Sequence, residues 1–186
     1  MIAFLVCSLI PILVQKPMQS TIDYSKSTIL EIQFSGISHG IVDILLHVRK
    51  APLACHQIER LTNTGFYNRQ KVFKVINLPK PFLVQMGDPL TKQGLQSPEV
   101  GTKGSGQRVP YEDSGYHMIK GAVALATLPG KPNSGDSQFF ILLGDYHNLL
   151  DHTATVFGQV IKGMSVVENL HVGDEIDSAR IIAPHS

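Results

Sequence analysis

A turn of small polar residues runs directly into an apolar segment in the nonapeptide Asn133-Ser134-Gly135-Asp136-Ser137-Gln138-Phe139-Phe140-Ile141. Asparagine, serine, glycine and aspartate supply the backbone conformations and local hydrogen bonds that turns require. Residues 138–143 are then mostly apolar without regular alternation, which predicts a strand buried on both faces. The nonapeptide therefore indicates a polar loop that leads into the core of a β-sheet.

The sequence on either side of this segment predicts further short strands. Residues 30–34 alternate apolar and polar side chains, residues 42–48 do so less strictly, and the turn-forming residues 35–40 between them favour a hairpin. The remaining expected strands lie at residues 72–76, 82–86, 121–126, 155–161 and 179–183.

Two helices and one long loop complete the expected elements. Pro52 favours the start of a helix that Gly65 ends, and residues 164–170 predict a second helix. Residues 87–115 are rich in Gly, Pro, Ser and Lys and predict a long loop, which is usually functional or mobile. Many short strands with two helices indicate a mainly β fold, a closed antiparallel barrel whose ends are plugged by helices.

The composition indicates one domain with nearly balanced charge. The chain has 186 residues, of which 43% are hydrophobic, enough for a sizeable single core. We assign the domain to residues 21–186, after a hydrophobic segment at residues 1–20. A net charge of +1 gives no reason to expect nucleic acid, an anionic membrane or an acidic substrate as the main partner. Cys55 is expected to be a small buried group in the first helix.

The N-terminal residues 2–14 are nearly all apolar. This run is too short for a membrane-spanning helix, which needs about 20 residues, but it suits a signal-peptide core of roughly 7–15 residues. A basic segment before it is absent, and no clean cleavage site follows at residues 15–20. We expect a degraded or mis-started export signal that directs the protein to the periplasm or outside the cell. The alternative is a disordered or strand-like extension on a cytoplasmic protein.

Motifs of nucleophilic and phosphate chemistry are absent. The sequence holds no Gly-x-Ser-x-Gly nucleophile elbow and no P-loop. Four residues in one loop could be read as metal ligands, namely Asp145, His147, Asp151 and His152. None of the established metal-ligand spacings is met, so a solvated polar turn is the preferred interpretation. The alternative is a metal-dependent enzyme that uses this loop. Zinc analysis of the purified protein distinguishes the two interpretations, because finding no metal would exclude the metal-dependent enzyme.

The nonapeptide resembles the cyclophilin signature, in which an Asn-rich turn runs into Ser-Gln-Phe-Phe-Ile. Other blocks agree with that family in order and rough spacing over about residues 28–183, in a manner closer to its bacterial members. These blocks are Ala51-Pro52, Phe66-Tyr67, Phe73-Lys74-Val75-Ile76, Phe82-Leu83-Val84-Gln85-Met86-Gly87-Asp88-Pro89, Gly104-Ser105-Gly106, Val156-Phe157-Gly158-Gln159-Val160 and Gly163-Met164.

The resemblance implies an eight-stranded antiparallel barrel with a helix at each end and a groove that isomerises Xaa-Pro bonds. Rotation about a peptide bond meets a barrier of about 18–20 kcal/mol, and Xaa-Pro exchange takes roughly tens to hundreds of seconds. Because no bond breaks, the catalyst needs no cofactor or metal and only has to bind the twisted amide better than the planar forms. The implied partners are proline-containing polypeptides, bound by a monomer that assists protein folding.

Site residues follow from the same resemblance, position by position. Phe82, Leu83, Phe140 and Leu150 would form the proline pocket, Gln85 would hydrogen-bond the substrate backbone, and Gln138 would support the floor. Ala126 and Thr127 would line the groove beside the residue before proline. The resemblance thus assigns catalysis to Phe82, Gln85 and Phe140, and substrate binding to Val75, Leu83, Ala126, Thr127, Gln138, Leu149, Leu150 and Ala154. Without the resemblance, Phe82, Phe140 and Leu150 would be read as core.

Several positions depart from the family pattern. The family's arginine donates a hydrogen bond to the prolyl nitrogen, and the Phe-x-x-Ile frame puts Val75 there, with Lys74 on the opposite face of the strand. Arg69 and Arg108 are the alternative donors. Losing one transition-state donor costs about 10²–10³ in rate by analogy with oxyanion holes. The sequence therefore predicts an isomerase of reduced efficiency, or alternatively a catalytically silent proline-binding or chaperone module.

Two further departures concern the walls of the pocket. Leu149 replaces the tryptophan that many members use to bind cyclosporin, so binding of that inhibitor is expected to be weak or absent. Ala154 replaces a pocket histidine and removes an aromatic wall.

Overall fold

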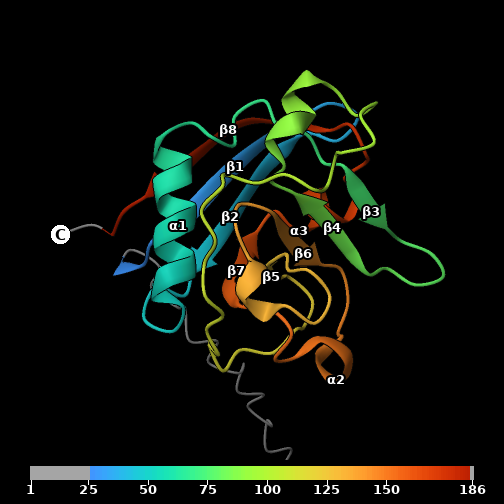
Figure 1. Ribbon diagram of the computed structural model, residues 1–186. Helices are drawn as coiled ribbons and strands as arrows, with labels where there is room; N and C mark the ends of the chain where they lie inside the picture. The colour runs from blue at the N-terminus through green and yellow to red at the C-terminus, as the bar shows by residue number, and fades with distance from the viewer. Residues whose placement is uncertain (1–25, 185–186) are drawn as a thin grey trace, which may run out of the picture.

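Eight antiparallel strands form one curled sheet in the computed structural model, which describes residues 26–184 (Figure 1). The order of the strands in the sheet is β3-β4-β6-β5-β7-β2-β1-β8. The strands are β1 (Ile29–Ser35), β2 (Gly40–Leu46), β3 (Lys74–Ile76), β4 (Leu83–Met86), β5 (Ala122–Leu125), β6 (Phe139–Leu142), β7 (Val156–Lys162) and β8 (Glu175–Ile182). The expected mainly β, eight-stranded antiparallel architecture is confirmed.

The two edges of the sheet are joined by the segment that precedes β3. Lys71 forms a bridge with Glu175 at the start of β8, and the amide of Val72 donates to the carbonyl of Asp174 at 2.8 Å. The amide of Ile176 donates in return to the carbonyl of Gln70 at 2.7 Å. These bonds satisfy edge groups that would otherwise be unpaired, and they curl the sheet towards a barrel.

Both expected helices are present, and one short helix was not predicted. The helices are α1 (Pro52–Asn63), α2 (His147–Leu150) and α3 (Met164–Glu168), with 3-10 turns η2 (Pro89–Gln93) and η3 (Pro132–Ser134). Pro52 stands in the first turn of α1, and the carboxylate of Glu112 accepts from the amides of Leu53 at 3.0 Å and Ala54 at 2.9 Å. A distant loop thus satisfies amides at the start of α1. The four-residue α2 is too short to show a helical period.

Each face of the sheet carries its own hydrophobic cluster. Phe139 and Ile141 of β6 lie in the larger cluster, which also holds buried residues of α1. Phe140 and Leu142 point to the opposite face and lie in a smaller cluster with Leu83. This arrangement explains why residues 138–143 lack alternation, since both faces of β6 are covered.

Two further predictions concern the N-terminal hydrophobic segment and the thiol of Cys55. The hydrophobic segment 1–20 lies outside the described residues. Within residues 26–184, no helix combines the length and apolar character needed to cross a membrane. Cys55 is buried as expected, and burial is the main cause that raises its pKa to about 12, so the thiol is unreactive at neutral pH.

The packing of His47 predicts a loss of stability in mild acid. Its ring is 8% exposed and stacks on Tyr116 at 3.7 Å between centroids, and burial lowers its pKa from 6.5 to about 4. Between these values the unfolded chain binds a proton that the folded protein does not. The free energy of unfolding should therefore fall, by at most about 3 kcal/mol, as the pH drops from 6.5 to 4.

Urea unfolding at a series of pH values measures this contribution. His47→Phe keeps a stacked ring without titrating, so its stability should fall less across the same pH range. His39→Gln, at an exposed position, should behave as the wild type. Equal pH dependence in all three proteins would contradict the assignment to His47.

Candidate functional site

A large hollow lies on the face of the sheet that carries the smaller cluster. We call it the main groove; its volume is about 610 Å³. Eight of the residues assigned from the sequence line it, namely Phe82, Leu83, Gln85, Ala126, Thr127, Phe140, Leu150 and Ala154. Its other lining residues are Lys74, the loop residues 128–132, His152 and Thr153.

A row of residues directly opposite one another across neighbouring strands builds the wall and floor of the groove. Gln85 pairs with Lys74 of β3 on one side and with Phe140 of β6 on the other, and Phe140 pairs with Ala124 of β5. Directly opposed residues in an antiparallel sheet share a face, so these side chains point to the same side. The groove therefore has a polar end at Lys74 and Gln85 and an apolar end at Phe140.

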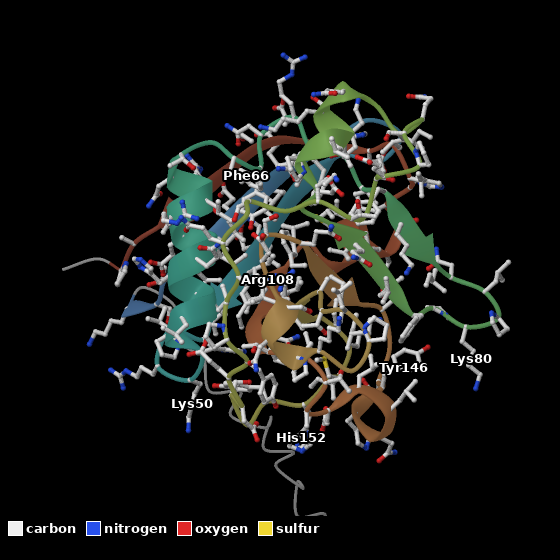
Figure 2. The ribbon with its side chains drawn as sticks, viewed as in Figure 1. Lys50, Phe66, Lys80, Arg108, Tyr146 and His152 are labelled. Atoms are coloured by element: carbon white, nitrogen blue, oxygen red, sulfur yellow. The ribbon has the colours of Figure 1, made fainter. Side chains whose placement is uncertain are left out.

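The apolar end of the groove is firmly packed. Phe140 is 9% exposed, while Phe82 packs edge-on against Tyr146 with 4.6 Å between ring centroids. The Tyr146 hydroxyl, on the side chain labelled in Figure 2, donates to the carbonyl of Pro81 at 2.6 Å. Phe140 is thus both core and groove floor, whereas Phe82 and Leu150 are only partly buried. A fixed apolar floor of this kind can hold a small ring such as that of proline.

Gln85 forms the polar part of the floor of the main groove, and Gln138, which lines the side hollow only, supports it. The amide nitrogen of Gln85 donates to Oε1 of Gln138 at 2.9 Å, and Nε2 of Gln138 donates to the carbonyl of Lys103 at 2.7 Å. Within residues 26–184 no donor reaches Oε1 of Gln85, so this oxygen can accept a hydrogen bond from a bound peptide.

A second hollow continues from the main groove beyond Ala126 and Thr127. We call it the side hollow; its volume is about 270 Å³ and it shares Gln85, Ala126, Thr127 and Leu128 with the main groove. Its own lining residues are Gly101, Thr102, Lys103, Gly104, Arg108, Ser134, Asp136 and Gln138. In Figure 2, Arg108 lies near the centre of the view, on the loop that crosses the front of the sheet.

Two carboxylates hold the long loop 87–115 so that part of it walls the side hollow. The fully buried Asp88 accepts from the amides of Leu90 at 2.8 Å, Gly101 at 2.7 Å and Lys103 at 3.1 Å. Asp136 accepts from the amides of Ser105 and Gly106, each at 2.9 Å. The described loop lines the side hollow and does not line the main groove.

The prediction that Val75 faces the groove and Lys74 faces away is wrong. Val75 pairs with the fully buried Val84 and packs against the larger cluster, on the opposite face of the sheet from the groove. Lys74 pairs with Gln85 and lines the groove. The Phe-x-x-Ile motif starting at Phe73 predicted the wrong face for both residues. The register of the β3–β4 hairpin decides which face each residue takes, and a shift of one residue exchanges the faces.

Other sequence-predicted residues lie away from the main groove. Leu149 is 68% exposed on α2 and lines neither hollow, whereas its neighbour Leu150 lines the main groove. Of the two alternative donors, Arg69 is exposed beside β8 and lines neither hollow, and Arg108 lines the side hollow only. Lys74, which the sequence motif had placed on the face away from the groove, lies directly opposite Gln85 on the neighbouring strand.

The polar loop around α2 uses its carboxylates in hydrogen bonds. Asp151 accepts from the amide of Met118 at 2.7 Å and lies 2.6 Å from Nδ1 of His117, and Asp145 accepts from the amide of Lys120 at 2.9 Å. No group of three His, Cys, Asp or Glu residues within the described part of the chain could hold a metal ion. These bonds are those of a structured polar turn.

Comparisons with known proteins agree with this geometry. Residues 29–185 match the family model described as cyclophilin type peptidyl-prolyl cis-trans isomerase. A probable peptidyl-prolyl cis-trans isomerase of Brucella abortus is 33% identical over 148 residues, which cover 76% of this chain and 73% of the relative. A peptidyl-prolyl cis-trans isomerase-like 3 protein of Gallus gallus is 35% identical over 134 residues, covering 70% of this chain and 76% of the relative.

Solved structures show the same fold. A cyclophilin-type isomerase of Cryptosporidium parvum superposes with a TM-score of 0.68 at 24% identity, covering 86% of this chain and 98% of the other. A structure of the same protein determined in the presence of the dipeptide Ala-Pro has a TM-score of 0.64 at 26% identity, covering 85% and 99%. The cyclophilin AquaCyp293 of Hirschia baltica has a TM-score of 0.65 at 19% identity, covering 89% and 80%.

The opposite orientations of Lys74 and Val75 predict opposite tolerance to arginine. Val75→Arg would force a charge towards the core and should lower the free energy of unfolding by roughly 2–4 kcal/mol. Lys74 is the neighbouring residue and is exposed, so Lys74→Arg should change the free energy of unfolding by less than about 0.5 kcal/mol. Urea unfolding of both variants checks this orientation, and equal stability of the two would contradict it.

Proposed function

This chain belongs to the cyclophilin-type peptidyl-prolyl cis-trans isomerase family, and from that membership we propose that it isomerises Xaa-Pro bonds in polypeptides and so assists their folding. The main groove is the proposed site, with the proline ring against Phe140 and the peptide backbone at Gln85. The structure of the similar Cryptosporidium protein determined with Ala-Pro supports a proline-containing ligand.

Lys74 supports this proposal most strongly. When the amide twists, the lone pair of the prolyl nitrogen is no longer delocalised and can accept a hydrogen bond, so a donor beside that nitrogen favours the twisted form. The ammonium group of Lys74 carries three donors and stands on the same face as Gln85. In the proposed mechanism Phe140 holds the ring, Gln85 holds the backbone and Lys74 donates to the nitrogen.

We expect the isomerase to be of reduced efficiency because Lys74, although it can donate to the prolyl nitrogen, is a weaker donor than an arginine. Lys74 is exposed, and within the described residues its ammonium group has no ion-pair partner to fix it. A lysine ammonium is strongly hydrated and sits on a flexible stem, whereas arginine presents a planar, preorganised set of donors. Ordering and desolvating Lys74 in the transition state would use part of the energy that its hydrogen bond supplies.

A silent proline-binding module is the second candidate, and the same exposure of Lys74 favours it. If the ammonium stays in water throughout, the groove would hold proline without lowering the barrier. NMR exchange spectroscopy on a proline-containing tetrapeptide separates the two candidates, because it reports binding through shifted resonances and catalysis through exchange between the cis and trans forms.

Variants of Lys74 test its role directly. Wild-type protein at catalytic concentration should accelerate exchange, Lys74→Met should lower the catalysed rate by roughly 10- to 100-fold, and Lys74→Arg should keep or raise it. Lys80→Met, on the exposed hairpin loop labelled in Figure 2, is the matched control and should leave the rate unchanged.

Three other outcomes would redirect the proposal. Shifted peptide resonances without accelerated exchange would favour the silent module. An active Lys74→Met protein would exclude Lys74 as the donor. Neither shifts nor exchange with any proline peptide would show that the main groove does not bind proline.

A further inference from the structure

Basic side chains gather along the main groove and the side hollow although the chain as a whole is nearly neutral. The formal net charge of all 186 residues is +1. Lys74 and Lys131 line the main groove, and Lys103 and Arg108 line the side hollow. Asp136 is the one acidic residue that lines either hollow in the described structure. The local excess of positive charge is therefore a property of this surface and not of the composition.

The side chains that line the two hollows carry a net positive charge, because Asp136 keeps its negative charge but is outnumbered by the four basic residues. Both carboxylate oxygens of Asp136 accept backbone amides of the loop, from Ser105 and Gly106. Lys103 pairs with Glu99 at 3.2 Å. For Arg108 and Lys131, no acidic group lies within ion-pair distance in residues 26–184. Two exposed cations without an ion pair thus line the two hollows, Lys131 the main groove and Arg108 the side hollow, and Leu128 lines both.

The residues shared by the two hollows indicate which residue of a bound peptide would enter the side hollow. Side chains of an extended peptide alternate, so the second residue before a proline points to the same side as the proline ring, about 7 Å away. The two hollows share Gln85, Ala126 and Thr127 as their common border. A peptide with proline over Phe140 that crosses Ala126 would therefore place this second residue in the side hollow, facing Arg108.

We infer that the site selects proline segments with an acidic side chain two residues before the proline, held chiefly by Arg108; this inference rests on the proposed function. A guanidinium can bind a carboxylate through two parallel hydrogen bonds. Lys131 adds a second positive charge at the border of the groove. The same positive charges repel a basic side chain at that position of the peptide. The site therefore favours acidic residues there and disfavours basic ones.

The size of the effect follows from the exposure of Arg108. Exposed ion pairs contribute modestly and are screened by salt. We expect a peptide Gly-Glu-Ala-Pro-Phe to be isomerised with a kcat/KM about 2- to 5-fold above Gly-Gln-Ala-Pro-Phe at low salt. Gly-Lys-Ala-Pro-Phe should fall below both, and the three values should converge in roughly 0.5 M NaCl because the Debye length shortens.

Kinetics on the three peptides with the full chain and two variants test the inference. Arg108→Glu should reverse the order and favour the lysine peptide. Lys50→Gln removes one exposed positive charge away from both hollows, at the lower left of Figure 2, and should keep the wild-type order. This control separates a specific contact from a general effect of net charge.

The outcomes distinguish failure of this inference from failure of the proposed function. Equal kcat/KM for the glutamate, glutamine and lysine peptides would overturn the selectivity while leaving the isomerase proposal intact. An unchanged order in Arg108→Glu would also overturn it, since the preference would then not involve Arg108. Neither binding nor accelerated exchange with the glutamine peptide, which needs no anion contact, would instead reject the proposed function.

Discussion

The register of β4 between β3 and β6 is the constraint on which the rest of the site depends. It places Lys74, Gln85 and Phe140 in one cross-strand row on the groove face, and Val75, Val84 and Ile141 in the next row on the core face. Backbone hydrogen bonds fix this register, and burial of the second row enforces it, because a shift of one residue would expose valine and isoleucine and bury lysine and glutamine. The same packing energy that stabilises the barrel therefore orients the polar groups of the groove.

Carboxylates that accept backbone amides hold the loops in place, and one of them, Asp88, is fully buried. Asp88 and Asp136 bind backbone amides of residues 101–106, and Glu112 binds the first amides of α1. Such charge-assisted bonds hold irregular backbone that has no ladder partner. Gln138 connects this loop to the sheet through the carbonyl of Lys103 and the side chain of Gln85. The wall of the side hollow is thus tied to the floor of the main groove by a continuous set of hydrogen bonds.

Net charge and local charge lead to different expectations for this protein. The sum of +1 gave no reason to expect an acidic substrate. Folding places Arg108, from the long loop, and Lys131, from the loop that precedes β6, along two adjoining hollows that together hold four basic side chains and one carboxylate, that of Asp136. A field at a groove depends on which charges are adjacent and which are already paired, and neither quantity is contained in a composition.

The sequence by itself determined the fold class, the eight strands and the two longer helices, because alternation, apolar runs and turn residues are local signals. The recognised motifs supplied Phe82, Gln85 and Phe140, which all line the groove. The tertiary structure alone decided that Lys74 and not Val75 faces it, that Leu149 stays outside, and that Arg108 lines the side hollow. Strand register and loop position arise from pairings between residues far apart in the chain, so no count along one segment can fix them.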